Sequence, residues 1–546
     1  MKIVCVNSME KIFPDIEPSL TLRRASVFGN ERYNFQFAVC SEKDVAATFS
    51  LSVNGREIPA KLVKSMPSQL SKYLNVSDDF VIFKERASTF YPDLLLPVPD
   101  KKIYLKKDCW TSIWGTVNGA ELSAGENHIS ISVCEDGENT YSAGFELDVL
   151  PADLPECDIP NTAWFHYDCI SDYYREKVFS PRYNEILRRY FKNMTEHGIN
   201  MLYVPMFSFA TNTEIGKYRK TVQLVDVAYD GKKYTFGFGR LIAFMKEAES
   251  FGFRYFEMSH MATQWGAKFS PKIIADIRGK KRRIFGWDVK STSPRYLRFL
   301  DEFLPAIVTA LDENGFSGRC FFHISDEPRY EFMENYKMLS EKFRQHLKSY
   351  KIFDALSNYD FYKEGLVDFP VVSSDAVAPF FENGVPVWLY YCCSQGGEYF
   401  SNRFFNMPLL RTRILGLQLF ANDIRGFLHW GYNFYYTNLS QKLIDPYFVT
   451  DAGNVYPSGD SFLVYPGAGG EPYDSVRNEA FGEAFQDYRA LLLLAALRGR
   501  DFVQKLLEKE GVSGLTKYPR DEKWFAEFRE RINALIMEAQ CSSEAV

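Results

Sequence analysis

Two neighbouring carboxyl groups, Asp326 and Glu327, are the residues best placed to do acid–base chemistry. They follow an apolar run at residues 320–325, Cys-Phe-Phe-His-Ile-Ser, which is typical of a buried strand that Pro328 then ends. Other Asp-Glu pairs lie in helical or tail segments, where a solvated surface explains them. Because desolvating two charges at a strand end costs free energy, a functional role is favoured. The alternative is a structural ion pair with Arg329 or with a basic residue across the rim.

The adjacency of the two carboxyl groups restricts the mechanism that they could serve. Most retaining glycosidases place two carboxylates about 5–5.5 Å apart on either side of the reacting carbon. Consecutive strand residues have Cα atoms about 3.8 Å apart and point to opposite faces, so they suit that scheme poorly. They suit substrate assistance, in which the sugar's own 2-acetamido oxygen is the nucleophile. In this division Glu327 is the general acid/base, and Asp326 orients the acetamido group.

The chain that must position this pair divides into three predicted regions. Residues 1–158 contain short alternating segments between turns, which is typical of a β-sandwich; examples are 34–39, 48–53, 128–134 and 144–149. A proline-rich stretch at 151–160 follows, and then strands alternate with helices. This alternation predicts a (β/α)8 barrel at 159–497, with a helical tail at 498–546. A doubly wound open sheet is the alternative, but no GxGxxG motif follows a strand.

The barrel elements are predicted by apolar runs and helix-capping residues. The candidate strands are residues 163–168, 201–206, 255–260, 320–325, 352–357, 371–375, 385–393 and 426–433. Helices are expected at 181–198, 240–250, 294–314, 330–350 and 408–423, with weaker links after the fifth and sixth strands. A long loop at about 435–478 precedes another helix at 479–497 and a charged helical tail to about residue 539. Because a loop this long is uncommon in a compact domain, we expect it to form a wall or lid of the site.

The composition excludes some classes of partner. The net charge is −6, and the basic run at residues 279–283 is short enough to be a solvated loop, so no nucleic-acid surface is expected. The longest apolar run, residues 491–497, is far too short to span a membrane. The ten cysteines show no CxxC spacing, and the first residues do not resemble a signal peptide, so we expect a cytoplasmic protein with reduced thiols. Aromatic residues make up 16%, which suits either a large core or sugar stacking.

The barrel segment resembles glycoside hydrolase family 123, the β-N-acetylgalactosaminidases, over roughly residues 160 to 495. The motifs that carry the resemblance are FHISDEP at 322–328, GFLHWGYN at 426–433, LVYPG at 463–467, SVRNE at 475–479 and QDYR at 486–489. The resemblance implies a sandwich before the barrel, Asp326 and Glu327 as the catalytic pair, retention of configuration and no metal or other cofactor. It also implies a glycan substrate with a terminal N-acetylhexosamine; a β-N-acetylglucosaminidase or another glycosidase on this barrel is the alternative. The tail motifs also resemble bacterial barrel proteins of unassigned activity.

Substrate-binding candidates follow from the rule that barrel active sites lie at the carboxyl ends of the strands. They are Trp430, Tyr432, Asn358, Asp375, Tyr390, Asp168 and His260, and Tyr465 is added as a candidate from the long loop. Trp430 could stack on the sugar and Tyr432 could donate to the acetamido oxygen, although packing of the barrel explains either residue equally well.

Two other classes of function stay open. A metal-dependent hydrolase would use histidines of the predicted strands, namely His166, His260, His323 and His429, together with Asp168. Against it, there is no His-x-His on the first strand, and metal analysis of the purified protein would discriminate between the two classes. A barrel that binds carbohydrate without cleaving it is the other class, and the intact Asp-Glu pair argues against it.

Overall fold

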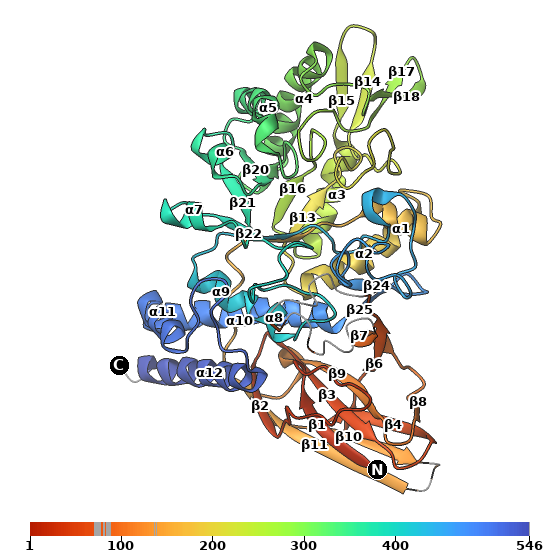
Figure 1. Cartoon of the computed structure of the whole chain (residues 1–546), viewed down its shortest axis with the longest axis vertical. Helices are drawn as coiled ribbons and strands as arrows, with labels where there is room; N and C mark the ends of the chain where they lie inside the picture. Colours follow the sequence, from red (N-terminus) through yellow and green to blue (C-terminus); the bar gives the residue numbers. More distant parts are fainter. Residues whose placement is uncertain (70–77, 80–81, 83–88, 136, 138, 545–546) are drawn as a thin grey trace.

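The chain folds into an N-terminal β-sandwich and a closed eight-stranded barrel, as predicted (Figure 1). The computed structural model describes residues 1–69, 78–79, 82, 89–135, 137 and 139–544. Within these residues, no helix combines the length and the apolar character that crossing a membrane requires.

The sandwich consists of two sheets, mainly antiparallel, that bury alternate side chains between them. One sheet has the order β1 (Lys2–Asn7), β3 (Arg32–Cys40), β9 (Trp110–Asn118), β6 (Ala60–Pro67) and β7 (Phe90–Pro97). The other contains β2 (Arg24–Phe28), β11 (Asn139–Leu150), β10 (Gly125–Glu135), β4 (Val45–Val53), β5 (Arg56–Glu57) and β8 (Lys102–Leu105). Phe35 and Phe37 from the first sheet pack edge-on against each other, and Phe145 from the second sheet contacts both. The four strand segments expected here therefore lie within β3, β4, β10 and β11.

The barrel closes through parallel strands that are short and almost wholly buried. In order around the barrel they are β12 (Asn161–Ala163), β13 (Met201–Val204), β16 (Tyr255–Met258), β19 (Cys320–Phe322), β20 (Lys351–Ala355), β21 (Phe369–Ser373), β22 (Trp388–Tyr390) and β23 (Phe427–His429). Each overlaps one predicted strand, so the predicted architecture is confirmed.

The first strand lies earlier in the chain than predicted. Only Ala163 of the expected strand at 163–168 belongs to β12, and α1 (Tyr167–Tyr173) begins before that stretch ends. The alternating aromatic residues Phe165 and Tyr167 resemble a strand, but both side chains are buried in the main core around the turn into α1. Asp168 is therefore a helix residue and not a strand end.

The helices around the barrel begin mostly where the capping residues predict. Ser180 and Ser293 cap α2 (Pro181–Glu196) and α4 (Pro294–Glu313). The remaining barrel helices are α3 (Gly239–Ser250), α5 (Met333–His346), α6 (Tyr359–Lys363), α7 (Ala378–Glu382), α8 (Leu410–Arg413) and α9 (Leu415–Ala421). The short α6 and α7 are the weak links expected after the fifth and sixth strands.

A small four-stranded sheet projects beside α4 and was not predicted (Figure 1). Its order is β15 (Tyr234–Gly237), β14 (Asp226–Tyr229), β17 (Ile273–Ile277) and β18 (Lys280–Phe285). The basic run expected to be a loop lies mostly in β18, and its four charged side chains are exposed. The run is therefore solvated as expected, but it forms a strand. The predicted long loop at 435–478 contains a short hairpin, β24 (Val464–Pro466) and β25 (Pro472–Asp474).

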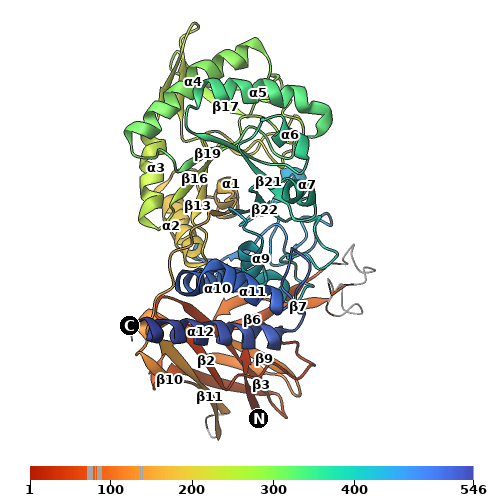
Figure 2. The ribbon, with the colours of Figure 1, turned by 90° about the vertical axis from the view of Figure 1, so that its left-hand side faces the viewer.

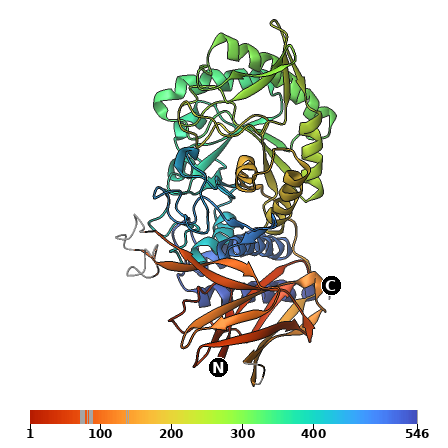
Figure 3. The same cartoon turned by 90° about the vertical axis from the view of Figure 1, so that its right-hand side faces the viewer.

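The C-terminal helices lie where the barrel meets the sandwich (Figure 2). They are α10 (Val476–Arg498), α11 (Arg500–Lys509) and α12 (Glu522–Glu544). Arg529 of α12 contacts Glu31 of the sandwich at 2.7 Å and Asp487 of α10 at 2.8 Å. Figure 3 shows the barrel on one side of this helical layer and the sandwich on the other.

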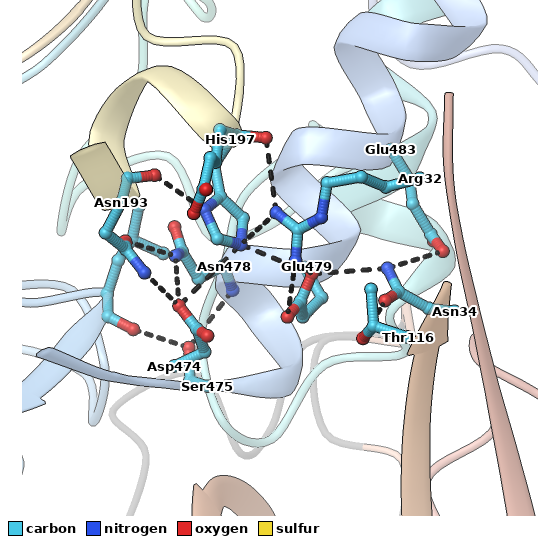
Figure 4. Close-up of polar contacts among 12 residues, drawn as sticks. Arg32, Asn34, Thr116, Asn193, His197, Asp474, Ser475, Asn478, Glu479 and Glu483 are labelled. Carbon is cyan, nitrogen blue, oxygen red and sulfur yellow. Dashed lines mark hydrogen bonds and ion pairs between the residues drawn. The ribbon is translucent and has the colours of Figure 1, made fainter. Parts of the chain in front are cut away.

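A buried polar cluster also joins the sandwich to the barrel side (Figure 4). Arg32 on β3 lies 3.1 Å from Glu479 on α10, and Asn34 donates to Glu483 over 3.1 Å. His197, which follows α2, lies 3.2 Å from the same Glu479 carboxylate. The contacts come from distant parts of the chain, so they hold the two regions in one arrangement.

Candidate active site

The carboxyl ends of the barrel strands surround a cavity of about 170 Å³. Its walls carry aromatic rings, two carboxyl groups, two thiols and a few amides and hydroxyls. The lining residues are Trp164, His166, Thr211, Asn212, Gln264, Trp265, Asp326, Glu327, Ala355, Tyr390, Cys392, Cys393, Leu428, Trp430 and Tyr456. Of the predicted site residues, Asp326, Glu327, Tyr390 and Trp430 thus line one cavity.

Both carboxyl groups reach this cavity because the backbone turns sharply at Glu327. Its φ is +43°, in the left-handed region that non-glycine residues rarely adopt. The turn is held from both sides: Glu327 N–H donates to the Ala355 carbonyl at 2.9 Å, and Trp265 N–H donates to the Asp326 carbonyl at 2.7 Å. The expected alternation of strand side chains is broken here, so two adjacent residues can line the same cavity.

A chain of hydroxyl groups leads from Glu327 to Asp375. Tyr390 donates its phenolic hydrogen to Glu327 Oε1 over 2.7 Å, and the Ser357 hydroxyl lies 3.4 Å from the same phenol. Ser357 donates to Ser373 over 3.0 Å, and Ser373 donates to Asp375 over 2.5 Å. Asp375 is outside the cavity lining, and this chain connects it to the site, as does Gln395, which donates to Asp375 over 3.1 Å.

Beneath the pair, a buried histidine lies between two carboxylates. His323 Nε2 is 2.5 Å from Glu257 and Nδ1 is 2.7 Å from Asp354, and all three side chains are fully buried. Burial alone would lower the pKa of His323, but the charge of Glu257 and the hydrogen bonds to both carboxylates raise it to about 9. His323 is therefore an imidazolium at neutral pH and donates from both nitrogens.

Asp354 also anchors the backbone segment that leads to Asp326 and Glu327. It accepts the backbone N–H groups of Ile324 and Ser325 at 3.1 and 3.2 Å, and Tyr336 donates its hydroxyl to it at 2.5 Å. The segment between β19 and Asp326 is thereby fixed to β20.

Burial and the neighbouring charge of Glu327 raise the pKa of Asp326 well above its ordinary value, although the His323 charge opposes this. The raised pKa favours the protonated form of Asp326. An N–H donor placed on Asp326 would instead favour its ionised form, because a hydrogen bond to a carboxylate stabilises the charge. The pair can therefore supply one acid and one hydrogen-bond acceptor.

Aromatic side chains form much of the remaining wall. The Trp430 indole donates to Asp460 over 3.0 Å and contacts the Tyr456 ring edge-on. Trp265 is 39% exposed at the rim and has a φ of +63°. Flat apolar faces around two carboxyl groups suit the apolar face of a sugar ring.

Several predicted site residues lie elsewhere. Tyr432 is fully buried and donates to Asn193 over 2.6 Å, so it packs in the barrel wall and not at the cavity. Tyr465 donates to Asp93 of the sandwich over 2.6 Å and serves the junction. Alternation along a strand does not say which face meets the cavity, which explains the position of Tyr432. Tyr465 was expected from the long loop, where no local pattern says which rings turn inward.

Asp168 and His260 lie near the cavity without lining it. Asp168 forms a buried ion pair with Arg219, with an Nε–Oδ2 distance of 2.7 Å. His260 stacks on His323 with ring centroids 4.0 Å apart, and burial together with the His323 charge lowers its pKa well below the ordinary value. Asn358 lines an adjoining open groove that shares Trp265, Glu327 and Tyr390 with the cavity.

Most of the loop residues in the wall were not predicted from the sequence, among them Gln264, Trp265, Cys392 and Tyr456. Trp265 follows the predicted third strand by only five residues, so a search a little past each strand end would have included it. Tyr456 is far from any barrel strand in the sequence, within the long loop for which a wall was expected. No local pattern indicates which of its aromatic rings turns inward.

Two groups of described residues are spaced closely enough to hold a metal ion, and neither suits one well. In the first group, His260, His323 and Asp354, both nitrogens of His323 already contact carboxylates. In the second, His197, Asp474 and Glu479, the cations Lys61 and Arg32 lie against the carboxylates at 2.7 and 3.1 Å. Both groups are better explained as internal ion pairs.

Comparisons with known proteins agree with the fold of the barrel. The profile of "Glycoside hydrolase 123, catalytic domain" matches residues 164–494. Among solved structures, a family 123 glycoside hydrolase from Clostridium perfringens, studied for glycolipid glycan hydrolysis, superposes with a TM-score of 0.73 at 14% identity, covering 99% of this chain and 98% of that chain.

Other glycosidases match much less closely. A Bacteroides ovatus family 5 xyloglucanase gives a TM-score of 0.30 at 10% identity, covering 85% of this chain and 98% of that one. An endo-β-1,4-mannanase from Thermotoga petrophila gives 0.35 at 15% identity, covering 61% and 77%. A search of curated proteins finds no match. The matched catalytic domain spans more than half of the sequence, and the chain therefore belongs to glycoside hydrolase family 123.

Proposed function

We propose that this glycoside hydrolase is a retaining, exo-acting β-N-acetylgalactosaminidase that uses the 2-acetamido group of its substrate as the nucleophile. One observation carries the proposal: among the described residues that line the cavity, only Asp326 and Glu327 carry carboxyl groups. A carboxylate nucleophile on an opposite strand would be a third acidic lining residue. The acetamido oxygen supplies the nucleophile that the cavity lining lacks.

The proposed reaction gives the two carboxyl groups different roles. Asp326 accepts a hydrogen bond from the acetamido N–H while the acetamido oxygen attacks the anomeric carbon. This attack closes an oxazoline ring. The glycosidic bond breaks, and Glu327 gives its proton to the leaving oxygen. Glu327 then takes a proton from water, which attacks the same carbon and reopens the oxazoline ring. Two inversions at this carbon return the original configuration.

The position of Glu327 between two hollows supports its role as the acid. Glu327 lines the cavity and also the adjoining open groove, which is lined further by Arg329, Tyr330 and Asn358. If the glycosidic oxygen lies at Glu327, the terminal sugar would therefore occupy the cavity and the leaving group would occupy the groove. Tyr330 is 62% exposed and offers a flat face. We propose that the leaving group is itself a glycan, since the relative from Clostridium perfringens is described as acting on glycolipid glycans.

A panel of aryl β-glycosides tests the proposal. The GalNAc glycoside should be cleaved, the GlcNAc glycoside more slowly, and glucosides or galactosides that lack the acetamido group hardly at all. The thiazoline analogue of GalNAc should inhibit competitively, because it resembles the cyclised intermediate. If neither the GalNAc nor the GlcNAc thiazoline inhibits, the substrate-assisted mechanism is wrong; if only the GlcNAc analogue does, the sugar assignment is wrong.

Tyr390→Phe should lower kcat/KM about 10- to 100-fold, because a hydrogen bond to a charged group contributes roughly 1.5–3 kcal/mol. We expect the loss mainly in kcat, since the phenol orients Glu327. Tyr391→Phe is the matched control: its hydroxyl has no hydrogen-bond partner among the residues described. Steady-state measurements of kcat and KM for both variants would show whether the loss is specific to Tyr390. Equal effects of the two changes would contradict a positioning role for Tyr390.

A further inference from the structure

The catalytic cavity contains a pair of thiols that the proposed reaction does not use. Cys392 and Cys393 lie just after β22, which ends at Tyr390, with one residue between, and both line the cavity together with Asp326 and Glu327. Neither cysteine is part of a disulfide, and both are partly exposed. The side-chain hydrogen bond with Cys393, together with burial, raises the pKa of the Cys392 thiol well above its ordinary value. The two sulfur atoms are thus close together within the catalytic cavity.

The backbone around the pair is held firmly. Cys392 N–H donates to Gln395 Oε1 at 2.9 Å, and the Cys392 carbonyl accepts from the Asn402 amide at 2.9 Å. Neighbouring Cα atoms are about 3.8 Å apart, whereas disulfides usually join Cα atoms about 4.4–6.8 Å apart. A disulfide between these residues would therefore be strained. A single thiophilic atom can bind both sulfurs without bringing them to bonding distance.

We propose that Cys392 and Cys393 form a dithiol site that binds trivalent arsenicals and soft divalent cations such as Cd²⁺, and that its occupation closes the catalytic cavity. Soft thiolate ligands select soft ions, and two thiols on one site bind more tightly than either alone. With phenylarsine oxide, two As–S bonds form, the arsenic–oxygen bond breaks, and the oxygen leaves as water with both thiol protons. Arsenic stays trivalent, so no oxidant or reductant is needed.

The test treats the full chain with phenylarsine oxide and reads two signals. Intact-mass and peptide mass spectrometry should find one phenylarsenic group that bridges Cys392 and Cys393. Turnover of an activated aryl glycoside should fall to background, and 2,3-dimercaptopropanol should restore it while a monothiol at equal thiol concentration should not. The bridged adduct is measured without substrate, so this result stands even if the sugar assignment fails.

Single variants Cys392→Ser and Cys393→Ser should each lose the bridged adduct, and each should keep its own untreated rate when the arsenical is added. The measured quantity is the ratio of treated to untreated activity, so a lower basal rate does not disturb it. Cys109→Ser is the matched control, because Cys109 lies near Cys40 on the sandwich, away from the cavity. Cys541→Ser removes an exposed thiol. Both control variants should be inhibited by phenylarsine oxide as fully as the native protein. A bridged adduct absent from the native protein, or inhibition unchanged in Cys393→Ser, would overturn the proposal.

Discussion

Replacing Glu327 by glutamine is expected to lower kcat/KM on unactivated glycosides by about 10²–10⁴-fold, the usual contribution of a positioned general acid. Glutamine is close in size but cannot give a proton to the leaving oxygen. A dinitrophenolate leaving group needs little protonation, so its release should suffer much less. Rates for a series of aryl glycosides, plotted against the acidity of the phenol, would show a steeper dependence in the variant.

Glu331→Gln is the control for this experiment, because it removes an exposed carboxyl group four positions along the chain without touching the cavity lining. This control should leave the rates for the aryl glycoside series unchanged. Azide should rescue the Glu327 variant on activated substrates, since this anion attacks without base assistance, and the glycosyl azide should have the β configuration. An equal loss on all leaving groups would show that Glu327 is not the acid, and an α-azide would contradict retention.

His323→Gln is expected to destabilise the barrel by about 3–5 kcal/mol, because it leaves Glu257 and Asp354 as buried carboxylates without their cation. The effect should depend on pH. The pKa of His323 in the folded state is about 9, above its unfolded value of about 6.5. The charged histidine therefore stabilises the fold fully below pH about 6.5, and this contribution is lost as pH rises through 9.

Calorimetric melting of the native protein between pH 6 and 10 should show this loss as a falling midpoint, and His323→Gln should remove most of the difference. His128→Gln is the matched control: His128 contacts Glu146 at 2.7 Å on the exposed face of the sandwich. Such surface pairs contribute about 0–1 kcal/mol, so this control should melt nearly as the native protein does. If both variants melt alike, His323 is not the cation that balances the two carboxylates.

The barrel and the sandwich could be predicted because their patterns are local. Ser180 before Pro181 and Ser293 before Pro294 mark helix starts, and these short signals are read within one turn of chain. The rule that barrel sites lie at strand ends likewise placed Asp326, Glu327, Tyr390 and Trp430 near one another. Strand ends were less certain: the aromatic alternation through Tyr167 resembles a strand, yet that residue begins α1.

The adjacent pair Asp326–Glu327, its position after a buried strand and the motifs shared with family 123 are thus properties of the sequence alone. Which way the two carboxyl groups face was decided by the tertiary structure, since the turn at Glu327 is held by carbonyl and amide groups of Ala355 and Trp265. The same is true of the charge on His323, which depends on carboxylates 66 and 31 positions away in the chain. Backbone strain and charge state depend on contacts between distant segments, and such contacts leave no local pattern in the sequence.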